Sequence, residues 1–246
     1  MKREGYGRGG RNEYISLDGL RVDGRRPEEV RHIACHIGTP GNAIDGNAYF
    51  EQGNTRVLAT VVGPRDRKSV THRMEEGMEL KCNYSNRQDR RSAKEIEPLL
   101  EDMFRSVILV DQYPKSRLDI SIEVIQADGS LLCAAVNAVS LALLHAGVPM
   151  KDMICAATVG MIDGQCVIDL NGYESSADGP VLQIGVLAQT GSISLLDIST
   201  RLSSASQLQE MVSAGTAGCK GIYSVVRSEA HDLIIRLASS RGILGT

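Results

Sequence analysis

Several residues of this chain have the types and spacing that bind phosphate groups. Three arginines, Arg87, Arg90 and Arg91, fall within the run NRQDRR. Guanidinium groups bind phosphate through paired hydrogen bonds, so a basic loop of this kind can hold a nucleic acid backbone. A hydroxyl, Ser130, stands at the start of a long apolar segment. Together these residues indicate anion binding.

The elements that must position Ser130 are a strand and a helix. Residues 118–124 alternate between apolar and polar side chains, which predicts a strand, and the apolar run 131–145 predicts a buried helix that ends at Gly147. A helix start offers free backbone N–H groups and the positive end of the helix dipole, which bind anions. Here the loop before the helix supplies one hydroxyl and no cation. The sequence therefore predicts a weakly equipped anion site.

The basic run stands ahead of another helix. Its apolar residues recur at helical spacing over 99–108, and Pro98 is predicted in the first turn. Residues 46–63 predict a hairpin that turns at Gly53-Asn54. Residues 208–237 predict one long helix or two, because three glycines lower the helix propensity.

Two more strands, 181–187 and 192–198, are predicted between the turn residues of the last third. The other carboxylates give no persuasive catalytic pair. Asp119 and Glu123 fit the solvated face of a strand, and Asp163, Asp169 and Asp178 fit solvated turns near the later strands. The histidines show no metal-ligand spacing, so neither a metal site nor a cofactor is predicted.

Composition limits the class of protein. The chain has 246 residues, 42% hydrophobic and 23% charged, with a net charge of −3, so a general electrostatic attraction to nucleic acid is absent and RNA contact would depend on a local basic patch. The six cysteines show no CxxC spacing, which predicts free thiols in a reducing compartment. No apolar run approaches the roughly 18 residues of a membrane span, so we expect a soluble intracellular protein without membrane contact.

The chain divides into a tail and a folded part. Residues 1–14 are rich in Gly and Arg and are predicted to be disordered, whereas residues 15–246 are predicted to form a single domain. A disordered terminus of this composition could touch RNA, but a tail without such a role is the simpler interpretation.

Ordered segments resemble the RNase PH family, in particular the RNase PH-like subunits of the RNA exosome ring, and the resemblance covers roughly residues 15 to 240. The subunit most similar to this chain carries the phosphorolytic site in archaeal and plant exosomes. The resemblance implies an α+β fold of the RNase PH type (ribosomal protein S5 domain 2-like), with mixed sheets packed with helices. The matching segments are LRVDGRRPEEVR (Leu20–Arg31), Gly46–Arg65, Asp89–Ile120, QADG followed by VNAVSLALLHAGVPM, and, more weakly, Val159–Glu174.

The resemblance also implies where an active site would lie. Active members bind the attacking phosphate with a Gly-Ser-Arg or Gly-Thr-Arg loop, and these positions fall on Ser130, Leu131 and Leu132. The catalytic Asp of active members falls on Val181, although a slip of the preceding loop would bring Asp178 into that place. The resemblance therefore implies a degenerate site without catalytic residues.

RNA contact is implied in the same way. Exosome ring subunits similar to this chain hold RNA with a paired Arg, here Arg90 and Arg91, next to Arg87. The spacing to Pro114 is one residue longer than in the family, so the matching pair is either Arg90-Arg91 or Arg91-Ser92. Backbone contacts of this kind are independent of sequence and sensitive to salt.

The implied function is a non-catalytic structural and RNA-channel subunit that supports 3′ to 5′ RNA processing and degradation. Its implied partners are single-stranded RNA, other RNase PH-like subunits in a hetero-hexameric ring, cap proteins with S1 and KH domains, and a hydrolytic exoribonuclease. We expect it in the nucleus, including the nucleolus, and in the cytoplasm.

Two alternatives stay open. An active phosphate-dependent 3′ to 5′ exoribonuclease would use Ser130, Arg90 or Arg91, and Asp178, with Mg²⁺ as an optional metal. A plain interaction scaffold would make no RNA contact.

Overall fold

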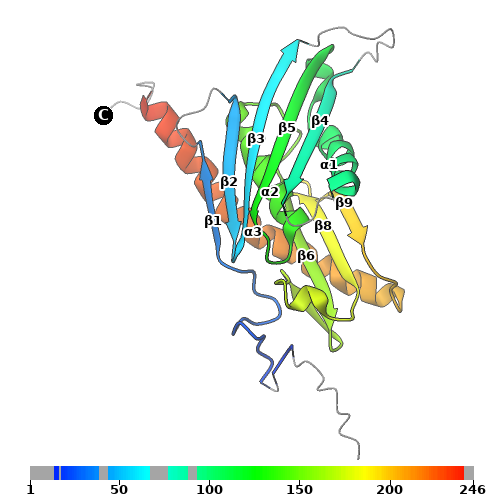
Figure 1. The fold of residues 1–246 in the computed structure, drawn as a ribbon. Coiled ribbons are helices and arrows are strands. Elements are labelled where there is room, and N and C mark those ends of the chain that lie inside the picture. The colour runs from blue at the N-terminus through cyan, green and yellow to red at the C-terminus, as the bar shows by residue number, and fades with distance from the viewer. Residues whose placement is uncertain (1–13, 17, 39–43, 67–76, 88–92, 241–246) are drawn as a thin grey trace, which may run out of the picture.

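Two β-sheets and three α-helices form the described part of the structure (Figure 1), a computed structural model that describes residues 14–16, 18–38, 44–66, 77–87 and 93–240. The first sheet has the order β1-β2-β3-β5-β4 and the second the order β7-β6-β8-β9. The strands are β1 (Ile33–Ile37), β2 (Gly46–Gln52), β3 (Thr55–Asp66), β4 (Glu79–Asn86), β5 (Ser116–Gln126), β6 (Ile154–Ile162), β7 (Gln165–Ile168), β8 (Val181–Leu187) and β9 (Ile193–Ile198). The helices are α1 (Ala93–Val107), α2 (Leu131–Ala146) and α3 (Ala205–Ser240), with short 3₁₀ turns η1 (Val110–Gln112) and η2 (Glu174–Ser176).

The first sheet contains the predicted hairpin. β2 and β3 pair antiparallel on either side of Gly53-Asn54, with Phe50 opposite Val57, which confirms the predicted turn. β5 lies antiparallel to β3 and parallel to β4. Side chains of β5 alternate between buried and more exposed positions, so one face of the sheet packs on the core. The first sheet is mixed, whereas every pairing in the second sheet is antiparallel, and both sheets pack with helices, which confirms the predicted α+β class.

Helix α2 packs against both sheets and lies behind the first sheet in Figure 1. Every residue from Leu132 to Leu143 is buried, as the apolar run 131–145 predicted. Two polar residues in this run bond to strand β6 where β7 does not pair with it. The Asn137 amide accepts from the Ala156 N–H (2.8 Å) and donates to the Ala156 carbonyl (3.0 Å), and the Ser140 hydroxyl donates to the Ile154 carbonyl (2.7 Å). Since each buried polar group has a partner, the helix is fixed against this strand.

Helix α1 closes the outer edge of the first sheet. Its Glu97 and Glu101 carboxylates accept hydrogen bonds from the backbone N–H groups of Tyr84 and Cys82, both 2.8 Å long. These bonds hold the first half of the helix against β4. The described helix already begins at Ala93, so Pro98 lies inside it, and the prediction that Pro98 occupies the first turn was wrong.

Helix α3 is one continuous helix, which settles the choice that the sequence left open. It packs on the face of the second sheet opposite α2. Two of its glycines are required there, because a Cβ on Gly215 would approach Ile184 to 2.5 Å and one on Gly218 would approach Ile168 to 2.8 Å. Their cost in helix propensity is thus offset by a close approach of helix and sheet.

Candidate functional site

The loop Asp128-Gly129-Ser130 leads from β5 into α2. Ser130 adopts a left-handed conformation (φ 52°), and its hydroxyl donates a 2.9 Å hydrogen bond to the Leu170 carbonyl. It makes no capping bond to the first turn of α2 and is 8% exposed. Gly129 also has a positive φ, and a Cβ there would lie 2.4 Å from the Leu170 carbonyl oxygen. The predicted anion-binding hydroxyl is therefore turned into the protein.

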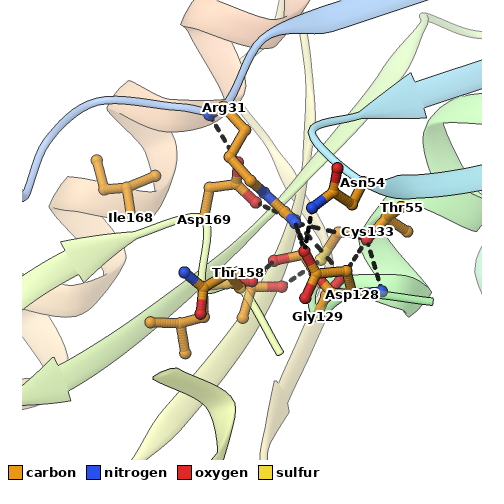
Figure 2. Close-up of polar contacts among 12 residues, drawn as sticks. Arg31, Asn54, Thr55, Asp128, Gly129, Cys133, Thr158, Ile168 and Asp169 are labelled. Carbon is orange, nitrogen blue, oxygen red and sulfur yellow. Dashed lines mark hydrogen bonds and ion pairs between the residues drawn. The ribbon is translucent and has the colours of Figure 1, made fainter. Parts of the chain in front are cut away.

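A buried guanidinium holds this loop from within. Arg31 donates to the carbonyl oxygens of Asp128 (2.5 Å) and Gly129 (3.5 Å). Its Nε and Nη2 donate to the two carboxylate oxygens of Asp169, at 3.0 Å and 2.8 Å. The backbone N–H of Arg31 donates to Asp169 as well (2.8 Å). Figure 2 shows Arg31 reaching from its own segment to Asp169 on one side and to the loop on the other.

Side chains of the β2–β3 turn add to this arrangement. The Thr55 hydroxyl donates to the Gly129 carbonyl (2.8 Å) and accepts from the Asp128 N–H (3.1 Å), and the Asn54 amide donates to the Asp128 carboxylate (3.1 Å). We call Arg31, Asn54, Thr55, Asp128 and Asp169 the Arg31 network. Its members come from four separate parts of the sequence, so it joins the two halves of the chain at the start of α2.

Asp169 is the charged centre of the Arg31 network. It is fully buried, and the prediction of a solvated turn was wrong for this residue. Burial disfavours its ionised form, but the hydrogen bonds and charge of Arg31 outweigh burial and hold the pKa of this carboxyl below its usual value. Nothing in the sequence around Asp169 marked it out, because its partner lies 138 residues away.

A second buried ion pair lies next to the Arg31 network. Arg21 and Glu174 have fully buried side chains and form two hydrogen bonds to each other, one of them 2.7 Å long. Arg21 also donates to the carbonyl oxygens of Ile168 (2.6 Å) and Asp169 (2.8 Å). The motif that contains Arg21 therefore serves to fix the segment around Asp169.

A hollow of about 340 Å³ borders Leu132 at the start of α2, and we call it the Leu132 hollow. Its lining residues come from three helices and strands besides α2, and they are Glu95, Ile96 and Leu99 of α1, Leu132 of α2, Gln183 of β8 and Asp197 of β9. None of these residues is cationic, and the two carboxylates are exposed at its mouth. The Gln183 Oε1 atom is buried without a hydrogen-bond partner among the described residues.

The predicted site residues are distributed unevenly around this hollow. Leu132 lines it, and Leu131 is the half-buried residue before it. Val181 begins β8 two residues before Gln183 and packs with a small cluster of Ile162, Val167 and Leu170. Asp178 is exposed in the loop before β8 and does not line the hollow.

Of the predicted RNA-contacting arginines, the structure describes only Arg87. Arg87 is exposed directly after β4, and Arg90 and Arg91 lie outside the described residues. The described residues hold no group of three or more His, Cys, Asp or Glu side chains placed to bind a metal ion. Among these same residues, no helix is both long and apolar enough to cross a membrane.

Comparison with known proteins agrees with this geometry. Residues 29–149 match the 3′ exoribonuclease family, domain 1 (RNase PH), and residues 152–218 match domain 2 of the same family. The mouse (Mus musculus) exosome complex component RRP41 is 36% identical over 91% of this chain and 94% of its own length. A putative exosome complex component RRP41 of Caenorhabditis elegans is 41% identical over 85% and 90%.

A solved structure shows the same fold. The crystal structure of rice (Oryza sativa) Rrp46 has a TM-score of 0.77 and 26% sequence identity, and the match covers 86% of this chain and all of that one. The predicted RNase PH-type fold is thus confirmed. From the two matched family domains, the extended similarity to RRP41 proteins and the shared fold, we conclude that this chain belongs to the RNase PH family of 3′ exoribonucleases.

Proposed function

We propose that this chain is a non-catalytic subunit of an exosome-type ring, in which it helps to guide single-stranded RNA. The similarity to RRP41 proteins over almost the whole chain supports membership of such a ring. The observation that carries the non-catalytic part is the Leu132 hollow. The family resemblance aligns the phosphate-binding Arg of active relatives with Leu132, which lines the hollow together with two carboxylates, Glu95 and Asp197.

The electrostatics of the hollow argue against phosphorolysis. The nucleophile in that reaction is a phosphate anion held against a polyanionic chain, so the site must supply positive charge. Each hydrogen bond to a charged group contributes about 1.5–3 kcal/mol, and the described lining offers none from a cation. Glu95 and Asp197 would instead repel phosphate.

The other candidate site residues do not replace the missing positive charge or supply a catalytic acid. The Ser130 hydroxyl is engaged by the Leu170 carbonyl, and the carboxylate of Asp178 lies away from the hollow lining. The family resemblance aligns the catalytic Asp of active relatives with Val181, whose side chain packs in an apolar cluster. RNA cleavage in the proposed complex is therefore carried out by another protein, a hydrolytic exoribonuclease.

The proposed complex contains other RNase PH-like subunits in a hetero-hexameric ring, capped by proteins with S1 and KH domains. RNA contact is assigned to Arg87, Arg90 and Arg91, which follow the end of β4 in sequence and precede α1. We propose that the complex acts in the nucleus, including the nucleolus, and in the cytoplasm.

Phosphate-dependent degradation of RNA tests the catalytic part. The complex purified with this chain is incubated with poly(A), with and without inorganic phosphate, after its hydrolytic nuclease has been inactivated. We expect no phosphate-dependent release of nucleoside diphosphate. Release that disappears in Asp178→Ala, with the ring still assembled, would show that the chain is an active phosphorolytic enzyme.

RNA binding by the assembled ring tests the guiding part. In Arg90→Glu/Arg91→Glu, the logarithm of affinity for single-stranded RNA should depend less steeply on the logarithm of salt, by about 1.4, because each lost phosphate contact removes ~0.7 from the slope. Arg227→Glu, which changes an exposed arginine on α3, is the matched control. An unchanged slope and unchanged RNA protection in the double variant would favour a plain scaffold.

A further inference from the structure

A larger hollow borders β7. It has a volume of about 760 Å³ and runs between residues 27–30, β7 and the middle of α3. Small residues of α3, among them Ala214, Ala217 and Gly221, form one wall. We call it the β7 groove. The glycine at 221 is not required for packing of the described chain, because its nearest neighbour to a Cβ would be Val30 at 4.0 Å.

One wall of the β7 groove is the edge of a β-sheet. β7 is an outer strand, and its Ile168 N–H points away from β6 and donates to the Pro27 carbonyl (2.8 Å). Backbone groups alternate in direction along an antiparallel ladder, so the N–H and C=O of Cys166 also point away from β6. The chain segment at Pro27 pairs with one end of this edge, and no other described residue pairs with the Cys166 end. An open edge of this kind accepts an extended segment through backbone hydrogen bonds.

The charges at the rim of the β7 groove favour a positively charged segment as its occupant. Its charged lining residues are Glu28 and Glu210, both exposed at the rim, and it contains no cationic lining residue. Residues 1–13 of this chain, which lie outside the described residues, have the complementary composition. They contain four cations and two carboxylates, with Gly at four positions, in the sequence MKREGYGRGGRNE.

The contacts of Tyr14 and Ile15, the first described residues, also favour residues 1–13 as the segment that binds in the groove. Tyr14 packs against Tyr173, with ring centroids 5.0 Å apart, and Tyr14 and Ile15 contact a cluster that includes Val167 of β7. Residues 1–13 are thus attached next to the strand that forms the groove wall. Thirteen extended residues can span about 43 Å, so the segment is long enough to reach around the edge of β7.

We propose that residues 1–13 bind in the β7 groove of their own chain, pairing with the open edge of β7 at Cys166 while their cations face Glu28 and Glu210. Because the segment is tethered, it meets the groove at an effective concentration on the order of millimolar. This assignment is independent of RNA binding at the start of α1.

The alkylation rate of the Cys166 thiol measures whether residues 1–13 cover the β7 groove. It is half-buried in the groove, whereas the other five cysteines are buried. Alkylation of Cys166 by iodoacetamide is followed by mass spectrometry in the full-length chain and in a variant whose four tail cations are neutral. We expect Cys166 to react roughly five- to tenfold faster in the neutral variant, since a tethered segment at an effective millimolar concentration then no longer covers it. The changes are Lys2→Gln, Arg3→Gln, Arg8→Gln and Arg11→Gln.

Two control variants make the result specific. A variant with Arg3→Lys, Arg8→Lys and Arg11→Lys keeps the charge and should react as slowly as the natural chain. On the groove side, Glu28→Gln should accelerate the reaction. Glu210 is left unchanged, because burial and, after it, the Glu210 charge raise the pKa of the Cys166 thiol to about 11, and removing Glu210 would alter reactivity directly.

Hydrogen exchange at the Cys166 amide is the second measurement. Strand pairing protects this N–H, so its exchange should also accelerate in the neutral variant and not in the lysine variant. Equal alkylation and equal exchange in the natural chain and the neutral variant would overturn the proposal. If the neutral variant loses affinity for single-stranded RNA while Cys166 is unaffected, the segment is an RNA-binding arm and the proposal is wrong.

Discussion

On one side of the loop that begins α2, the Arg31 network pairs every buried charge, and on the other side the Leu132 hollow exposes two carboxylates beside apolar walls. The paired side fixes the backbone of the loop, whereas the open side is where the proposed function places a lost phosphate site. On that proposal, the chain keeps the residues that shape the site and lacks the residues that would react in it. The residues that hold the start of α2 in place are therefore different from those that line the open hollow beside it. Substitutions on the two sides should change the free energy of unfolding by very different amounts.

Removal of the central charge of the Arg31 network should have the largest effect. Asp169→Asn keeps the shape of the side chain but leaves the buried guanidinium of Arg31 without its counter-charge. We expect the free energy of unfolding to fall by about 3–5 kcal/mol, the usual cost of breaking a buried ion pair. Urea denaturation at pH 7 measures it. Asp119→Asn, which removes a more exposed partner of Arg117, should cost at most about 1 kcal/mol; similar losses in the two variants would contradict the comparison.

Low pH should remove the difference in unfolding free energy between the natural chain and Asp169→Asn. The pKa of Asp169 is lower in the folded chain than the ordinary value of 3.8, so its ionisation stabilises the folded state above that pH. The stabilisation is lost as the pH falls through the folded pKa, where the carboxyl becomes protonated. The gap in unfolding free energy between the natural chain and Asp169→Asn should be constant from pH 7 to about 5 and shrink below pH 4. A gap that widens in acid would show that the charge is not the stabilising feature.

Loss of the Leu132 side chain should have an intermediate effect. Leu132→Ala removes a mostly buried side chain that borders the hollow, and we expect a loss near the lower end of the range of about 2–5 kcal/mol for Leu→Ala. Leu141→Ala in the same helix removes a fully buried side chain and should cost more. Thermal unfolding of the two variants gives the order, and a greater loss at Leu132 would mean that its packing is not relieved by the hollow.

The Ser130 hydroxyl should contribute less. Ser130→Ala removes the hydrogen bond to the Leu170 carbonyl and should cost about 1 kcal/mol, without any change in the affinity for inorganic phosphate. Ser175→Ala removes an exposed bond of similar length and should cost less than about 0.5 kcal/mol. Calorimetric titration with phosphate completes the test, since weaker binding in Ser130→Ala would return the hydroxyl to an anion-binding role.

Neutralising the hollow should have the smallest effect on stability. Glu95 and Asp197 are exposed, so the double variant Glu95→Gln/Asp197→Asn should unfold within about 0.5 kcal/mol of the natural chain. The same chemical change at Asp169 should lower the free energy of unfolding by about 3–5 kcal/mol. A large loss in the double variant would mean that the hollow has a structural role of its own.

Patterns within short segments predicted the elements, and contacts between distant segments decided the site. The apolar run of α2 and the Gly53-Asn54 turn were predicted because the residues that define them are neighbours in sequence. The partnership of Arg31 and Asp169 was not, because an Asp before Leu170 and Asn171 has the pattern of an ordinary turn. The position of Pro98 was missed for a similar reason, since the start of α1 is stabilised by the bonds of its glutamates to β4.

The position of Leu132 was predicted from the family resemblance, but the carboxylates opposite it were not. Glu95 and Asp197 lie about a hundred residues apart in sequence and meet only because α1 and β9 pack together. A single sequence carries no sign of that pairing. The absence of Asp178 from the hollow lining likewise follows from the path of the loop before β8 and not from any local pattern.

The amide of Asn137 has a mechanical consequence. Its two bonds hold both the N–H and the C=O of Ala156 in β6, as a neighbouring strand would, and Ser140 holds the carbonyl of Ile154 about one helical turn further along. Helix α2 can therefore neither rotate about its axis nor slide along it without leaving peptide groups unsatisfied in a dry interior. A displacement that starts at its first turn should therefore be passed on to β6.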